Sequence, residues 1–179
     1  GGRPVEVFSR GGDEDAWTLH ADGRVVTGPD AAFPMDGAGQ EDLRGLRAAL
    51  TTVDLEQFYQ DFASIGIGFG ASFRGVSEVW SGPGEAVGAV ALPAGVEGLG
   101  LRLHPALLDG CFQVVAAAGQ ATDERTAGEV RATYMPFSLA ELWVDGALPE
   151  RVVCHARLRP SGADEAVDAS RDAALPEVL

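Results

Sequence analysis

The sequence has 179 residues, of which 46% are hydrophobic and 22% charged. These are values of a globular chain with a real core, and they argue against disorder along its whole length. The net charge of −14 argues against nucleic acid or an anionic membrane as a partner. No apolar run approaches the roughly 20 residues of a spanning helix, and no leader segment opens the sequence. We therefore expect a cytoplasmic protein whose two cysteines, Cys111 and Cys154, are reduced core residues.

The sequence opens with two predicted strands, residues 4–10 and 16–26, because apolar and polar residues alternate there. Turn signals stand at Gly11-Gly12-Asp13 and again at Ala21-Asp22-Gly23. Residues 27–53 are predicted to be a linker, since Gly, Pro, Ala and Asp dominate its first half. A short helix is expected near the end of this linker, where three leucines recur.

A helix is predicted from Asp54 to about Ser64. Asp54 has the chemistry of an N-cap, and Gln57 stands at the reciprocal position of a capping box. Apolar side chains then recur at helical spacing, at Leu55, Phe58, Tyr59 and Phe62. The three glycines between residues 66 and 70 are expected to end this helix.

The rest of the chain combines predicted strands with one further helix. Strands are expected at residues 73–80 and 85–92, joined by a turn, at 131–144 with a bend at Pro136, and at 152–158. The helix covers residues 105–118, and residues 161–179 carry no strand pattern. The pattern as a whole predicts an α+β fold.

The helix at 105–118 carries the residues with the clearest chemical potential. Pro105 suits a first helical position, and an apolar stripe follows at Leu108, Cys111, Phe112 and Val115. Asp109 borders this stripe, and Gln113 stands over the same face four residues later. A carboxylate at such a border is partly desolvated, which favours its protonated form and suits general acid catalysis. The alternative is a solvated first-turn acid that the helix dipole stabilises, and spacing alone favours this alternative, because first-turn acids are common.

Other catalytic or binding motifs are weak. The glycines of Gly66-x-Gly68-x-Gly70 follow a helix and lack the Lys-Ser/Thr of a phosphate loop, so a turn is the simpler interpretation. His20, His104 and His155 show no metal-ligand spacing, and we expect no metal site. No Gly-x-Ser-x-Gly elbow exists, and Cys111 falls on the apolar stripe.

Residues 104–113, His-Pro-Ala-Leu-Leu-Asp-Gly-Cys-Phe-Gln, resemble the catalytic aspartate motif of dehydratase domains in modular polyketide synthases. Residues 66–75 and 134–138 resemble two further segments of that family, in the family's order. Weaker similarity covers residues 6–10 and 17–23. Within the second segment Phe69 replaces the usual Tyr, and Ala71 replaces Pro.

The resemblance implies a hot-dog fold, in which a bent antiparallel sheet wraps around a long helix, and places this chain in the second half of a double hot-dog. Residues 1–26 would then be the closing hairpin of the preceding half, 27–53 a linker, 54–160 the C-terminal hot-dog, and 161–179 an incomplete or flexible tail. The resemblance assigns Asp109 as the catalytic acid and Gln113 as its helper. It also implies an acyl channel lined by Phe69, Gly70, Phe73, His104, Leu108, Tyr134 and Pro136.

The implied reaction is removal of water from a β-hydroxyacyl thioester, carried on the phosphopantetheine arm of an acyl carrier protein, to give an enoyl thioester. No metal or redox cofactor is implied. The implied partners are the carrier protein, an N-terminal hot-dog half that holds the catalytic histidine, and a second copy of the synthase in a homodimer. The histidine motif, His-x-x-x-Gly-x-x-x-x-Pro, is not found in this sequence, so activity of this chain alone is doubtful.

Two alternatives stay open. The first is a dehydratase-like cyclase or isomerase that uses the same pocket, which the change at Phe69 favours. The second is a non-catalytic scaffold or binding module of a megasynthase, which the absent histidine favours. For a docked acidic carrier protein, the candidate basic patch is Arg151, Arg157 and Arg159, although solvated charges on an edge strand are the preferred interpretation of these residues.

Overall fold

The computed structural model describes residues 2–12, 16–28, 43–120 and 136–159. The chain divides into two compact units, residues 1–39 and 40–179, and each is described by itself. None of the helices in these described ranges has the length and apolar content needed to cross a membrane.

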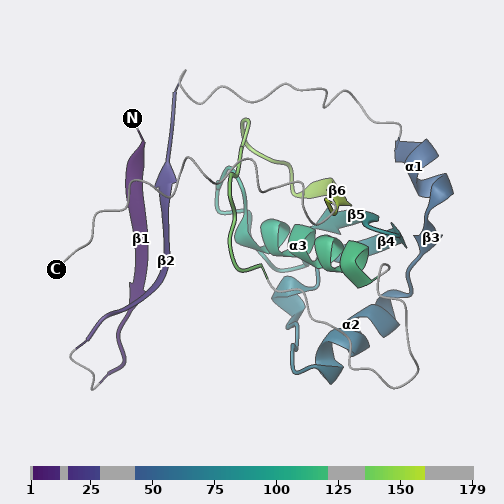
Figure 1. Ribbon diagram of the computed structural model, residues 1–179, viewed down its shortest axis with the longest axis horizontal. Helices are drawn as coiled ribbons and strands as arrows, with labels where there is room; N and C mark the ends of the chain where they lie inside the picture. The colour runs from purple at the N-terminus through teal and green to yellow at the C-terminus, as the bar shows by residue number, and fades with distance from the viewer. Residues whose placement is uncertain (1, 13–15, 29–42, 121–135, 160–179) are drawn as a thin grey trace. The chain divides into compact units, whose positions relative to one another are not determined.

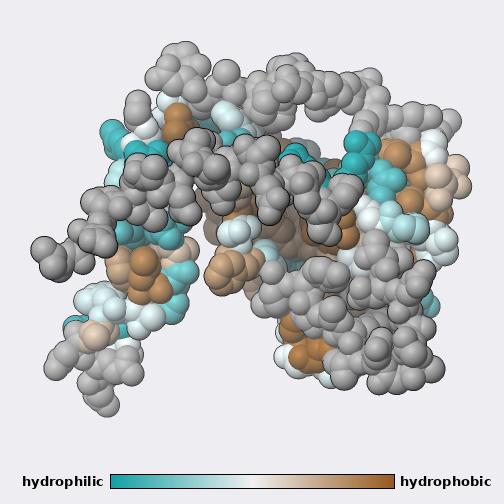
Figure 2. Space-filling view, in the orientation of Figure 1, coloured by the Kyte–Doolittle hydropathy of each residue, from teal (hydrophilic) through white to brown (hydrophobic). Residues whose placement is uncertain are grey.

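The first unit is a β-hairpin of β1 (Arg3–Ser9) and β2 (Thr18–Val25), which confirms the two predicted strands. The predicted turn at residues 21–23 is wrong, because these residues continue β2 and pair with Val5, Glu6 and Val7. Pairing with β1 therefore overrides the local preference of these residues for a turn. A bulge at Val7/Phe8 leaves His20 as the extra residue of β2. Both strands are exposed, and apolar and polar side chains mingle on the hairpin surface (Figure 2).

The second unit contains a four-stranded antiparallel sheet in the order β3-β4-β5-β6. Its strands are β3 (Thr51–Thr52), β4 (Val76–Gly82), β5 (Glu85–Ala91) and β6 (Arg151–Arg157). The turn between β4 and β5 is Pro83-Gly84, shorter than predicted, and Gly84 has a φ of 70° that suits glycine. Phe73, the expected first residue of this strand, instead ends a short 3₁₀ helix, η1 (Ala71–Phe73), and β4 begins at Val76.

Residues 43–53 of the predicted linker include a helix and a short strand. The expected short helix is present as α1 (Leu43–Ala49). Thr51 and Thr52 pair with Ser81 and Trp80, so the last residues of the predicted linker belong to the sheet. The composition that suggests a linker is confined to residues 27–40. Thr51 and Thr52 lie beyond it, and threonine is a typical strand residue.

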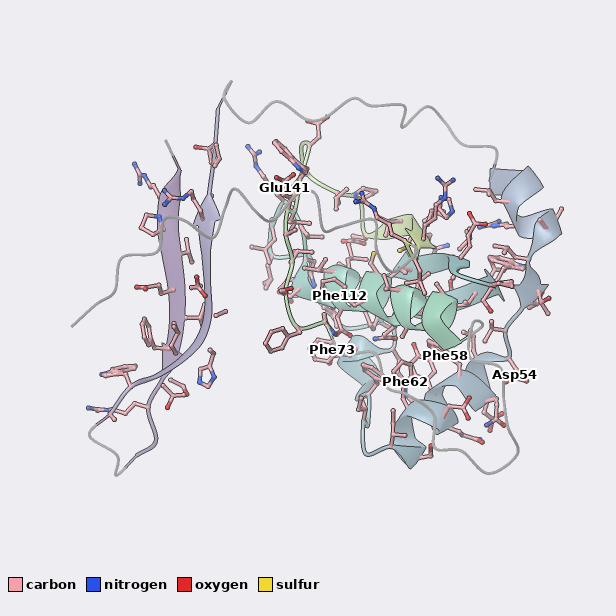
Figure 3. The ribbon with its side chains drawn as sticks, viewed as in Figure 1. Asp54, Phe58, Phe62, Phe73, Phe112 and Glu141 are labelled. Atoms are coloured by element: carbon pink, nitrogen blue, oxygen red, sulfur yellow. The ribbon has the colours of Figure 1, made fainter. Side chains whose placement is uncertain are left out.

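Helix α2 (Leu55–Ser64) begins and ends as the sequence predicts. The Asp54 carboxylate accepts a hydrogen bond from the backbone N–H of Gln57 at 3.0 Å. The Gln57 side chain donates to Asp61 rather than back to the cap, so the predicted capping box is only half formed. Phe58 and Phe62 lie on the buried face, and their rings meet edge to face with centroids 5.1 Å apart (Figure 3).

Helix α3 (Pro105–Gln120) lies across one face of the sheet, over β4, β5 and β6 (Figure 1). It is the central helix that the pattern predicts, but its buried stripe is displaced. The most deeply buried side chains of the helix are Val114 and Ala118, followed by Leu107 and Ala117, whereas Val115 is 39% exposed. The other predicted stripe residues, Leu108, Cys111 and Phe112, are half-buried.

The displacement follows from two glycines. A Cβ on Gly110 would lie 2.4 Å from Cγ1 of Val90, and a Cβ on Gly88 would lie 2.4 Å from Cγ2 of Val114. Helix and strand therefore fit together through reciprocal contacts of glycine and valine. Because glycine has no side chain, an apolar pattern does not mark Gly110 as a buried position. The pattern therefore predicts the neighbouring stripe that begins at Leu108.

Strand β6 confirms the predicted alternation: Val152, Cys154 and Ala156 face the core side, while Arg151 and Val153 are exposed. The strand predicted over 131–144 is wrong where it can be compared, because residues 136–144 form no regular strand. Residues 131–135 lie outside the described ranges. Four residues after this segment, the Leu148 N–H donates to the Arg102 carbonyl.

Candidate active site

Asp109 and Gln113 stand one turn apart on α3 and are in direct contact. The Gln113 amide nitrogen Nε2 donates to Oδ2 of Asp109 at 2.7 Å. Gln113 is a buried polar residue, only 3% exposed, while Asp109 is half-buried. The spacing predicted that the two side chains share a face, and the structure joins them by a short hydrogen bond.

The remaining polar atoms of the Gln113 amide are also satisfied. Nε2 donates a second hydrogen bond to the backbone carbonyl of Phe73 at 2.9 Å, and Oε1 accepts from the hydroxyl of Tyr59 at 3.1 Å. Both amide protons therefore have acceptors, and the oxygen has a donor. Because a reversed amide would present its N–H groups to the Tyr59 hydroxyl and its oxygen to two acceptors, this network fixes how Gln113 faces Asp109.

Tyr59 belongs to this site, although the sequence analysis assigned it only to the core. Its ring packs edge to face against Phe69, and the Arg74 guanidinium lies over it at 4.9 Å. Burial raises the pKa of the Tyr59 hydroxyl, which keeps it a neutral donor. The available signal was that Tyr59 carries the sole side-chain polar atom on an otherwise apolar helix face, and a buried hydroxyl needs a partner.

Three of the predicted channel residues lie close to this network. Phe69 packs on the core between Phe62 and Tyr59, and Gly70 caps η1. The carbonyl of Phe73 accepts from Gln113, while its side chain is 45% exposed below α3 (Figure 3). The backbone contact with the acid-bearing helix thus comes from Phe73 of η1. The expected close approach at the glycine turn is wrong, because no atom lies within 4 Å of a Cβ placed on Gly66, Gly68 or Gly70.

The other predicted channel residues are placed differently. His104 caps α3, where its Nδ1 accepts the N–H of Ala106 at 3.1 Å, and it lines a cavity of about 320 Å³ with Leu107 and Leu148. Leu108, the residue before Asp109, is half-buried. Pro136 is exposed. Tyr134 lies outside the described residues.

The other two histidines have partners of their own. Nε2 of His155 lies 2.8 Å from Oε1 of Glu85, and Nε of Arg157 lies 3.3 Å from the same oxygen. The hydrogen bond from His155 is the main cause that holds the pKa of Glu85 below its ordinary value. His20 contacts the hydroxyl of Ser9 within the hairpin.

The described residues contain no group of three or more His, Cys, Asp and Glu side chains able to hold a metal ion. The predicted basic patch is divided. Arg157 is engaged by Glu85, Arg159 follows the end of β6, and Arg151 lines a separate cavity of about 560 Å³ with Arg47 and Glu78.

Comparison with known proteins gives a family match. Residues 39–174 match the family described as "Polyketide synthase dehydratase N-terminal domain". The chain is 33% identical to mycoketide-CoA synthase of Mycobacterium tuberculosis over 170 residues, and 36% identical to pikromycin polyketide synthase component PikAII of Streptomyces venezuelae over 154 residues. The alignments cover 90% and 84% of this chain, and 4% of each of these two relatives.

Solved structures give the same result. The dehydratase domain from the CurK module of curacin polyketide synthase is 36% identical, with a TM-score of 0.53 over 64% of this chain and 39% of that one. Two further structures of the CurK dehydratase are titled inactive mutants, one with histidine changed to phenylalanine and one with aspartate changed to asparagine. This likeness, together with the antiparallel sheet of the second unit, confirms the expected α+β hot-dog fold.

Proposed function

This chain belongs to the polyketide synthase dehydratase family, and from that membership we propose that it supplies the aspartate-bearing half of a dehydratase active site. The substrate class is a β-hydroxyacyl thioester on an acyl carrier protein, and the product is the enoyl thioester. Asp109 is the proton donor to the departing hydroxyl, and Gln113 positions it. No metal or redox cofactor takes part in this scheme.

The observation that carries the proposal is the oriented carboxyl of Asp109. Oδ2 is bound to the buried amide of Gln113, and Oδ1 has no hydrogen-bond partner among the described residues. One oxygen is thus held in place while the other is available to a substrate hydroxyl. A solvated first-turn acid needs no such support, so the network favours the catalytic interpretation over that alternative.

The assignment to the aspartate-bearing half depends on residues 104–113. The matched family description names an N-terminal domain, whereas these residues resemble the aspartate motif of the C-terminal half. Support comes from the CurK dehydratase, whose titles describe an aspartate variant and a histidine variant as inactive. In that protein the histidine precedes the aspartate, which is the order that our proposal requires.

The proposed chemistry divides between two groups. A base removes the proton next to the thioester carbonyl, and the Asp109 carboxyl gives its proton to the β-hydroxyl, which leaves as water. We assign the base to a histidine of the preceding hot-dog half, because none of the three histidines of this chain stands in the family's histidine motif. In this chain His20 contacts Ser9, His104 caps α3 and His155 is bound to Glu85. Holding acid and base across one channel lets both act without moving.

A second candidate function is a cyclase or isomerase that uses the same pocket. Phe69 supports it, because the ring packs directly on Tyr59 beside the Gln113 network, where a tyrosine would add a hydroxyl. The change from tyrosine to phenylalanine at this position removes a hydroxyl from the lining of the pocket, and this alters how the enoyl product binds. Analysis of the products from one β-hydroxyacyl thioester separates elimination from ring closure or double-bond migration.

The test of the proposed function is complementation. The chain is assayed with a β-hydroxyacyl thioester on a carrier protein, alone and together with a histidine-bearing dehydratase half, and the enoyl thioester is measured by mass spectrometry. We expect enoyl product only when both halves are present. Product from the chain alone would show that the base is misplaced, and no product under either condition with a correctly folded pair would favour the scaffold alternative.

A further inference from the structure

The two cysteines of the chain meet between α3 and β6, although 43 residues separate them. The Sγ of Cys154 lies 3.7 Å from the backbone carbonyl oxygen of Cys111. Both are free thiols and both are half-buried, so each retains some contact with solvent. Neither periodicity nor spacing indicated that the thiols are neighbours, because the contact depends on how α3 crosses the sheet.

The contact makes the two thiols chemically unequal. A hydrogen bond from the Cys154 thiol to the Cys111 sulfur holds the pKa of Cys111 below its ordinary value. The same contact, together with burial, raises the pKa of Cys154. Cys111 is therefore the sulfur that becomes a thiolate first, and the thiolate is the form that reacts with oxidants.

We propose that Cys111 and Cys154 form an oxidisable pair, in which a hydroperoxide oxidises Cys111 and Cys154 then closes a disulfide between α3 and β6. In the first step the Cys111 thiolate attacks the peroxide, and a sulfenic acid and an alcohol or water result. In the second step the Cys154 sulfur attacks the sulfenic sulfur, and its proton leaves with the hydroxide as water. Two thiols are oxidised and one peroxide is reduced.

The position of the pair links it to the candidate active site. Cys111 follows Asp109 by two residues on α3, whereas Cys154 lies in the middle of β6. A disulfide between Cys111 and Cys154 would link α3, which carries Asp109, covalently to β6. It would also remove the free thiol of Cys111 two residues from Asp109. The consequence for the folded chain is a higher unfolding temperature in the oxidised form than in the reduced form, because the cross-link constrains the unfolded state.

The test uses the full chain with a stoichiometric amount of hydrogen peroxide, followed by peptide mapping without reductant. We expect one linked peptide pair that contains both cysteines, with loss of two hydrogens from the intact mass and of both free thiols. In Cys154→Ser, Cys111 should instead stop at the sulfenic acid and be trapped by a dimedone-type reagent. In Cys111→Ser, Cys154 should react far more slowly.

A matched control is the wild-type chain in denaturant, where the two thiols are no longer held together. The proposal is overturned if the folded chain consumes its thiols without a linked peptide, or if the folded and denatured chains form the link at equal rates. It is also overturned if Cys111→Ser and Cys154→Ser consume peroxide equally fast. The Cys154→Ser variant keeps the first reactive thiol, so the result does not depend on one variant folding well.

Discussion

The amide of Gln113 donates a 2.7 Å hydrogen bond to Asp109 while its oxygen accepts one from the hydroxyl of Tyr59. Tyr59 of α2 is therefore linked to the Asp109 carboxyl of α3 through the buried amide of Gln113. The carbonyl of Phe73 completes the amide's partners from a third element, η1. Since three elements hold one side chain, the orientation of the candidate acid depends on the fold of the whole second unit.

Replacement of Gln113 with alanine should reduce both stability and turnover. The change leaves the Tyr59 hydroxyl and the Phe73 carbonyl without their partner in a buried place, which costs about 1–3 kcal/mol for an unsatisfied group. Denaturant unfolding checks the free energy, and enoyl formation by the two-half domain checks the activity. If turnover is retained when stability falls, Gln113 is structural and does not position Asp109.

Tyr59→Phe tests the outer link of the same network. The ring contacts with Phe69 remain, so the loss is one hydroxyl donor to the Gln113 oxygen, worth about 1 kcal/mol of stability. We expect a smaller fall in turnover than for the alanine variant of Gln113. Kinetics of both single variants and the double variant measure the coupling, and full additivity would contradict a shared network.

Gly110→Ala should destabilise the second unit even though alanine favours helix. The added methyl would lie 2.4 Å from Cγ1 of Val90, and such overpacking costs about 1–3 kcal/mol. Chemical denaturation measures the change. The matched control is the double variant with Val90→Ala, which removes the clashing atom and should recover part of the loss. A stabilised single variant would show that α3 and β5 are not in close contact there.

Glu85 should contribute to stability in the acid range. Its pKa is lowered in the folded state, chiefly by the hydrogen bond from His155, so its contribution is complete above the unfolded pKa of about 4.3. That contribution disappears as the pH falls through the lower folded value. Glu85→Gln should therefore flatten the stability profile below about pH 5. Unfolding curves between pH 3 and 7 check this, and identical slopes for both proteins would contradict it.

Much of the fold could be predicted because strong local signals agree with the tertiary contacts. The Asp54 cap, the apolar face of α2 and the alternation of β6 all have their predicted roles. The stripe on α3 was misjudged because Gly110 buries a helix face without a side chain. The turn expected at residues 21–23 was overridden by pairing with β1, which local preference does not report.

The candidate site was predictable only along one helix. The contact between Asp109 and Gln113 follows from a spacing of four residues, which helical geometry fixes. Tyr59 and the Phe73 carbonyl join them across long sequence separations, and the two cysteines meet in the same way. Such contacts depend on how the elements cross, and no pattern within a single element encodes that.

The most direct test of the central claim is the elimination rate of Asp109→Asn in a protein that holds both halves of the active site. Asparagine keeps the shape and an acceptor for the Gln113 amide but has no carboxylic proton to donate. We predict a loss of about 10²–10⁴-fold in enoyl formation, the usual contribution of a general acid. The control, Asp145→Asn on the exposed surface, should leave the rate unchanged. A variant Asp109→Asn that folds and eliminates water at the wild-type rate would contradict the assignment of Asp109 as the proton donor.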